Sequence, residues 1–224
     1  MTPVRAPRWF EVCDLAAPDE NARAHWIRSP EEWEREIIAL IGEQGAIRED
    51  HLYRFLPRPR EEVDEILSMF VAERFVERQE ILYEQPAWVW LTPPAVRVSG
   101  TGLSVYTPTA GALERVFAIN ELRLFYFETA PAGRWISRRL LKKGPNAEAS
   151  VPIAEFKIGG ERHAVELRLT PTNPEYFVEV MKTRCRSYVL VACFCAPTVV
   201  DQVQEFKERY GWSRLVVCNL PELP

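Results

Sequence analysis

The sequence predicts a protein of the α/β (α+β) class, built from a helical N-terminal unit and a mixed-sheet C-terminal unit. Helical apolar spacing dominates the first third of the chain and leads into two β-rich runs, whereas hairpins and then alternating helices and strands fill the second half. Charge divides in the same way. Residues 1–107 hold 12 arginines and no lysine against 19 acids, and the remainder holds 16 basic against 13 acidic residues. We therefore expect an N-terminal arm over residues 1–28, a first unit over 29–107 and a second unit over 108–224.

Bulk composition excludes several classes of protein. With 224 residues and 47% apolar content, the chain is long enough to bury a substantial core. No run of about 18 apolar residues occurs, and the N-terminus lacks the apolar segment of a secretory signal, so we expect a cytoplasmic protein without a membrane partner. Five cysteines without a CxxC pair or zinc-ligand spacing predict reduced, mostly buried thiols.

The first unit begins with three predicted helices. Ser29 is suited to cap the first, with Pro30 in its first turn, and Trp33, Ile37, Leu40 and Ile41 share one face. A second, shorter helix is predicted over 48–56, closed by Pro57 and Pro59. The third starts near Arg60, where apolar residues recur with helical spacing at Val63, Ile66, Leu67, Phe70 and Val71.

Two β-rich runs, residues 75–78 and 87–92, follow the helices. Three helices and a hairpin in this order predict a winged helix-turn-helix. Pro93, Pro94 and the glycine-containing stretch from Val98 predict a hinge between the two units. A long, broadly apolar helix is then expected over 109–128.

The second unit is expected to contain a mixed sheet covered by helices. The predicted order is strand 151–157, a Gly159–Gly160 turn, strand 162–169, helix 174–186, strand 188–194, helix 197–210 and strand 213–218. On the second strand, Val165, Leu167 and Leu169 alternate with Glu166, Arg168 and Thr170. This alternation predicts that one face packs on the core while the other presents polar groups.

This layout is typical of a restriction-endonuclease-like nuclease of the PD-(D/E)xK type. Such an enzyme binds Mg²⁺ with an Asp on the preceding hairpin and an acid on the strand, and a Lys two residues later orients water. Here the three positions are Asn146, Glu166 and Arg168. Only Glu166 keeps the required chemistry, because Asn146 lacks the charge that holds Mg²⁺ and Arg168 does not act as a base at neutral pH.

Several segments together resemble the replication-relaxation family of plasmid and mobile-element proteins, over roughly residues 29–221. They are the helix 113–124, the segment 135–141, the turn 145–148, the strand 165–170 and the closing stretch 215–221. The resemblance implies a winged helix joined to a restriction-endonuclease-like unit that acts on DNA in plasmid replication or transfer. It also implies that Thr172 stands where the family has its Lys, which makes Asn146, Glu166, Arg168 and Thr172 the remnant site.

The predicted function is therefore DNA binding without catalysis, and no cofactor is expected. One alternative is an active nuclease in which Glu148 and Glu155 join Glu166 as Mg²⁺ ligands. The other is a protein-interaction adaptor, in which the first unit docks a partner or forms a homodimer.

Two groups of cations are candidates for contact with DNA phosphates. The first group lies in the segment 134–143, beside an aromatic ring, and consists of Arg134, Arg138, Arg139, Lys142 and Lys143. On a helix, Arg138 would share a face with Lys142, and Arg139 would share one with Lys143. The second group precedes and begins the third helix and consists of Arg54, Arg58 and Arg60. The exposed face of that helix is acidic, which opposes its insertion into DNA and keeps the adaptor alternative open.

Overall fold

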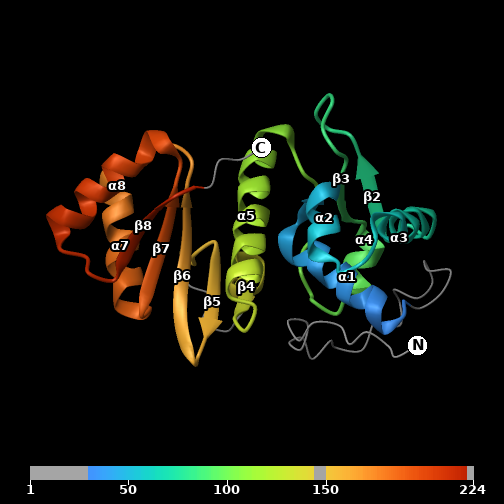
Figure 1. The fold of residues 1–224 in the computed structure, drawn as a ribbon, viewed down its shortest axis with the longest axis horizontal. Coiled ribbons are helices and arrows are strands. Elements are labelled where there is room, and N and C mark those ends of the chain that lie inside the picture. The colour runs from blue at the N-terminus through green and yellow to red at the C-terminus, as the bar shows by residue number, and fades with distance from the viewer. Residues whose placement is uncertain (1–29, 144–149, 221–224) are drawn as a thin grey trace. The chain divides into compact units, whose positions relative to one another are not determined.

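The protein has a mixed α/β architecture with two sheets, as the sequence predicts (Figure 1). The computed structural model describes residues 30–143 and 150–220, so the predicted N-terminal arm lies outside the described residues. The chain divides into two compact units, residues 1–125 and 126–224. This division falls within the long helix α5 (Ala110–Thr129), whereas the sequence placed the whole of that helix in the second unit.

Three helices build most of the first unit. They are α1 (Glu32–Gln44), α2 (Glu49–Phe55) and α3 (Arg60–Ala72). The Glu34 carboxylate accepts a hydrogen bond of 2.7 Å from the Glu31 N–H and thereby fixes the start of α1. Helix α2 ends before Pro57 and α3 starts directly after Pro59, because proline disfavours a helical conformation in the residue before it.

A small antiparallel sheet completes the first unit. Its strands are β1 (Ala46–Arg48), β2 (Val76–Gln79) and β3 (Trp88–Leu91), and β3 lies between the other two. The sequence predicts β2 and β3 but not β1, whose three residues are too few to show an alternating pattern. The buried faces of all three helices, including Val63, Ile66, Leu67 and Phe70 of α3, join the sheet in one apolar core.

The predicted hinge after β3 is wrong. Residues Pro93–Val98 form helix α4, which begins with both prolines in its first turn, where the missing N–H groups are tolerated. The Thr92 hydroxyl caps this helix by accepting a hydrogen bond from the Ala95 N–H at 3.3 Å. Because Ala95, Val96 and Val98 are buried, α4 is part of the packed first unit.

The second unit contains a five-stranded mixed sheet in the order β4-β5-β6-β7-β8. The first three strands pair antiparallel and the last three pair parallel. They are β4 (Arg134–Ser137), β5 (Ala154–Ile158), β6 (Glu161–Arg168), β7 (Leu190–Cys195) and β8 (Leu215–Asn219). Gly159 and Gly160, both at positive φ, form the predicted turn between β5 and β6.

Two helices connect the parallel strands, α7 (Pro174–Ser187) and α8 (Pro197–Tyr210). The Asn173 side chain caps α7 by accepting a hydrogen bond of 3.1 Å from the Tyr176 N–H. Helix α8 ends at Gly211, which adopts the left-handed conformation that glycine tolerates best. Apolar side chains of α7 and α8, among them Phe177 and Phe206, pack on β6, β7 and β8 and form the second core.

The basic segment 134–143 is not one helix. Its first four residues form β4, the edge strand of the sheet, and the next four form the short helix α6 (Arg138–Leu141). Ser137 caps α6 through a hydrogen bond of 3.4 Å from the Leu140 N–H to its hydroxyl oxygen. The predicted pairing of Arg138 with Lys142 and of Arg139 with Lys143 on helix faces is therefore wrong, because α6 ends at Leu141.

Candidate nucleic-acid interface

Glu166 lies in the interior of the second unit, where it pairs with an arginine that the sequence analysis did not select. Its side chain is only 7% exposed, and its Oε1 accepts a hydrogen bond of 2.9 Å from Nε of Arg184 in α7. The Nη2 of Arg168 is 3.8 Å from the other carboxylate oxygen. Arg184 is also buried and donates a hydrogen bond of 3.1 Å to the Ser150 hydroxyl.

This burial corrects the prediction of an open polar face on β6. Ala164 and Glu166 point to the same side of the strand, and on that side Phe177 and Met181 of α7 pack with Ala164 in the second core. A buried carboxylate is tolerated when it is paired and hydrogen-bonded. Glu166 is paired with a cation and hydrogen-bonded to it, because Arg184 supplies both interactions. Its chemistry in this structure is therefore that of a buried ion pair.

Glu155, the proposed replacement ligand on β5, has cationic partners of its own. Its side chain is 2% exposed, and Oε2 accepts hydrogen bonds from Arg162 Nε at 3.0 Å and Nη2 at 2.7 Å. Its Oε1 lies 3.4 Å from Nζ of Lys157. Burial raises the pKa of Glu155, but the hydrogen bonds from Arg162 and the charges of Arg162 and Lys157 outweigh burial and lower the pKa below its ordinary value.

The remaining members of the remnant site are not brought together with these acids. Asn146 and Glu148 lie outside the described residues, and Thr172 is half-buried in the loop between β6 and α7. Glu155 and Glu166 share one face of the sheet but are held by different arginines. Within residues 30–143 and 150–220, no three His, Cys, Asp or Glu side chains form a group suited to a metal ion.

The predicted phosphate-binding arginines of the first unit each contact an acid within that unit. Arg54 donates to both carboxylate oxygens of Glu121 at 3.0 Å. Arg58 pairs with Glu62 one turn into α3, and Nε of Arg60 lies 4.0 Å from Oδ2 of Asp64. Their positive charge is therefore offset locally, and little of it remains for DNA phosphates.

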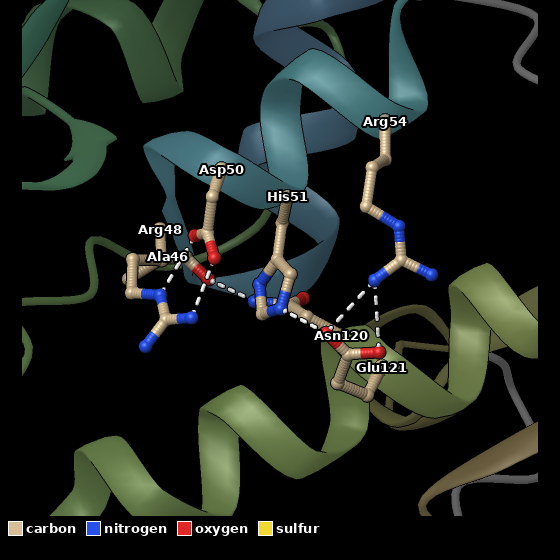
Figure 2. A network of polar contacts seen from close by, with 7 residues as sticks. All are labelled: Ala46, Arg48, Asp50, His51, Arg54, Asn120 and Glu121. Carbon is tan, nitrogen blue, oxygen red and sulfur yellow. Dashed lines mark hydrogen bonds and ion pairs between the residues drawn. The ribbon is translucent and has the colours of Figure 1, made fainter. Parts of the chain in front are cut away.

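Figure 2 shows the polar network that joins α2 and β1 to α5 within the first unit. The buried His51 places Nε2 2.7 Å from Oε1 of Glu121, the carboxylate that also binds Arg54. Asn120 donates a hydrogen bond of 3.0 Å to the Ala46 carbonyl of β1. The hydrogen bond to His51 lowers the pKa of Glu121; burial opposes this shift and Arg54 adds to it. These contacts fix α5 to the first unit, and they assign His51 and Arg54 structural roles.

The predicted basic group of the second unit differs in its surroundings. Residues 134–143 contain no Asp or Glu. In the described part of the chain, no carboxylate pairs with Arg134, Arg138 or Lys142. Arg139 and Lys143 make further contacts. Arg134 stands on the edge strand β4, Arg138 begins α6, and the exposed Lys142 follows it. Lys142 and Lys143 are exposed, whereas Arg134 and Arg138 are half-buried and the Nε of Arg138 is buried. The positive charge most accessible to a polyanion is therefore at the end of the segment.

Strand register brings two more cations to this region, Lys157 and Arg162. Lys157 of β5 lies directly opposite both Arg134 of β4 and Arg162 of β6. The sequence analysis missed them because each looks like an ordinary polar residue at a strand end. The Gly159–Gly160 turn gave a usable signal: in a tight hairpin, residues equidistant from the turn face each other.

Comparison of the chain with family models, with curated proteins and with solved structures finds no match in any of the three. Among the described residues, no helix combines the length and the apolar character needed to cross a membrane.

Proposed function

We propose that this chain is a non-catalytic DNA-binding protein whose main contact with DNA phosphates is the basic segment 134–143. The observation that carries the proposal is the charge of this segment, which has five cations, no acid, and three cations without a carboxylate partner in the described residues. DNA affinity comes largely from neutralising phosphates and releasing their counterions. Cations that are not already paired within the protein supply that effect best.

The element order of the first unit supports its assignment as a winged helix. The order α1, β1, α2, α3, β2, β3, with β3 in the middle of an antiparallel sheet, fits a helix-turn-helix followed by a β-hairpin wing. In the second unit, a β5–β6 hairpin followed by parallel strands and helices fits a restriction-endonuclease-like sheet. A role in plasmid or mobile-element replication or transfer is part of the proposal and rests on the sequence resemblance.

The absence of catalysis is proposed from the surroundings of the two candidate carboxylates. Metal-dependent phosphodiester cleavage needs carboxylate oxygens that are open to the ion and to water. Glu166 binds Arg184 beneath α7, and Glu155 binds Arg162 and Lys157. Each carboxylate would have to break a charged hydrogen bond before it could hold Mg²⁺.

Fluorescence anisotropy with labelled duplex and single-stranded oligonucleotides tests the binding. Titrations between about 50 and 400 mM salt should give an affinity that falls steeply with salt. The variant Arg138→Gln with Lys142→Gln should lower the slope of log K against log salt by roughly 1.8 on duplex, about 0.9 for each lost phosphate contact. The control Lys182→Gln with Arg209→Gln removes the same charge from pairs on α7 and α8 and should leave the slope unchanged.

Absent or salt-independent binding by the unmodified protein would refute the proposed function. Incubation of plasmid with Mg²⁺ or Mn²⁺ tests the second part of the proposal. The protein and a Glu166→Gln variant should both leave the plasmid intact, and cleavage by the unmodified protein alone would establish a nuclease.

The acidic surface of α3 favours a second function for the first unit, as a docking site for protein. Glu61 and Glu65 are exposed on α3, while its neighbouring arginines are paired with acids. Charge reversal of both, Glu61→Lys with Glu65→Lys, should weaken self-association measured by sedimentation if this surface forms a homodimer. An increase of the salt slope by about two would instead place α3 against DNA.

A further inference from the structure

Three cations form a row across three strands of the second unit. Arg134, Lys157 and Arg162 are direct partners in the β4–β5 and β5–β6 registers. Directly opposed residues in antiparallel strands project to the same face, and neighbouring strands lie about 4.8 Å apart, so the row extends over roughly 10 Å. The side chains of Lys157 and Arg162 are 42% and 54% exposed, and Arg134 is half-buried. We call these three residues the basic row.

The charge of the basic row exceeds what the surrounding acids offset. Glu155 contacts Lys157 and Arg162, and Glu166, farther along the same face, is paired with Arg184. Glu161 belongs to the opposite face, where it lies 3.4 Å from His163. Among the described residues, the three cations of the row therefore have one carboxylate in contact with them, that of Glu155, which contacts Lys157 and Arg162. Like charges directly opposite each other destabilise a sheet, and a bound anion relieves that repulsion.

The guanidinium at each end of the row is suited to phosphate. Guanidinium groups are planar, remain charged at neutral pH and bind phosphate oxygens with two parallel hydrogen bonds. Arg162 is also held in place by its two hydrogen bonds to Glu155 and by stacking on Tyr188, with its Cζ atom 5.1 Å from the centroid of the ring. A positioned arginine loses less side-chain entropy when it binds a ligand.

A second group of cations lies at the other end of β4. Arg134 begins this strand and Arg138 follows it directly, so about 13 Å of extended chain separates the basic row from the cations of α6. A ligand with repeated negative charges can contact both groups at once, whereas a single small anion cannot. This spacing favours a polyanion as the ligand.

We infer that the basic row is a second phosphate contact of a nucleic-acid backbone that passes from α6 along β4 and across β5 and β6. The inference rests on the proposed function and extends the DNA contact to Lys157 and Arg162. Phosphodiester recognition of this kind is independent of base sequence, because phosphates carry no sequence information.

The test uses the variant Lys157→Gln, which leaves Arg134 of the segment 134–143 and the hydrogen bonds between Arg162 and Glu155 in place. Its affinity and salt slope are compared with those of the unmodified chain and of a Lys182→Gln control, which removes one charge from a surface pair on α7. The slope should fall by roughly 0.9 on duplex or 0.7 on a single strand, so the two arms identify which form binds. If affinities converge near 1 M salt, this change is about an 8-fold loss at 0.1 M for duplex. Unchanged thermal unfolding shows that the variant remains folded.

Three results would overturn the inference, and they are distinguishable. If the unmodified protein binds DNA and the row variant keeps its slope, the basic row is not a contact, while the proposed function stands. If the unmodified protein binds no nucleic acid, both fail together. If polyglutamate competes as well as an oligonucleotide of equal charge, the row recognises acidic protein and the assignment to a nucleic-acid backbone is wrong.

Discussion

Removing the carboxylate of Glu166 should destabilise the second unit far more than a surface substitution would. The Glu166→Ala change leaves Arg184 in the core, 3% exposed at its side chain. Within residues 30–143 and 150–220, the hydrogen bond to Ser150 is then the one that its side chain keeps. Breaking a buried ion pair by removing one partner typically costs about 3–5 kcal/mol. The reciprocal change, Arg184→Met, leaves Glu166 with Arg168 at 3.8 Å and should cost a similar amount.

The double substitution distinguishes a paired charge from general core damage. Glu166→Leu with Arg184→Met replaces both charges by apolar groups of similar size, and such replacements are often neutral or stabilising by about 1–4 kcal/mol. A double-mutant cycle compares Glu166→Leu alone, Arg184→Met alone and the double variant. The cost of the double variant should be lower than the sum of the two single costs by about 3 kcal/mol or more.

Urea unfolding followed by circular dichroism measures these changes. Each single substitution should move the midpoint of the second unit's transition by more than about 1 M. If either single substitution lowers the free energy of unfolding by less than about 1 kcal/mol, or if the two losses simply add, Glu166 and Arg184 do not form a buried ion pair that stabilises the fold. An added Mg²⁺ arm tests the competing role: stabilisation of the unmodified chain but not of Glu166→Gln would identify Glu166 as a ligand.

Three further predictions concern the fold. Gly133→Ala should destabilise the protein by about 1–3 kcal/mol in urea unfolding, because its Cβ would lie 1.9 Å from the Phe156 ring; an unchanged midpoint would contradict this packing. Asn173→Ala should cost about 0.5–2 kcal/mol through loss of the α7 cap, and Asn173→Ser should restore most of it. The folded pKa of Glu121 is lowered by the hydrogen bond to His51, so its stabilising effect is present above pH 4.5, the ordinary value, and is lost as pH falls through the folded pKa. Thermal unfolding between about pH 3 and 6 should therefore show that Glu121→Gln loses less stability on acidification than the unmodified protein does. Equal losses of stability in the variant and the unmodified protein would contradict the lowered pKa.

The longer helices and strands were predictable because they carry enough residues to show a period. Helix α3 repeats its apolar residues over 13 positions, and its start at Arg60 was predicted. Helix α8 has proline at its start and glycine after its end, and both of its bounds were predicted. Strand β1 contains three residues, too few for alternation to be recognised. Strands β2, β3 and β4 contain four residues each, and β2 and β3 were found from their β-rich runs, whereas the cations in and after β4 suggested a helix. The cations of the basic segment are spaced three and four apart, which suggested helix faces, although its first four residues form β4.

The candidate site was less predictable, because the alternation of residues along a strand shows which face of the sheet a side chain lies on but not which element packs over that face. The pattern at 165–170 placed Glu166 on the face opposite Val165, and it could not reveal that α7 packs over that face. Arg184 is 18 residues away along the chain, so no local spacing connects the two. The basic row depends on register, which becomes evident only after β5 and β6 are paired around the glycine turn.

The buried pair of Glu166 and Arg184 also constrains how this chain can evolve. A substitution at either position alone leaves an uncompensated charge in the core, and a loss of several kcal/mol is a large fraction of the stability of a typical domain. The two positions should therefore change together, or only after another substitution has raised stability. Related chains should carry either both charges or two apolar residues at these positions and should rarely carry one charge alone.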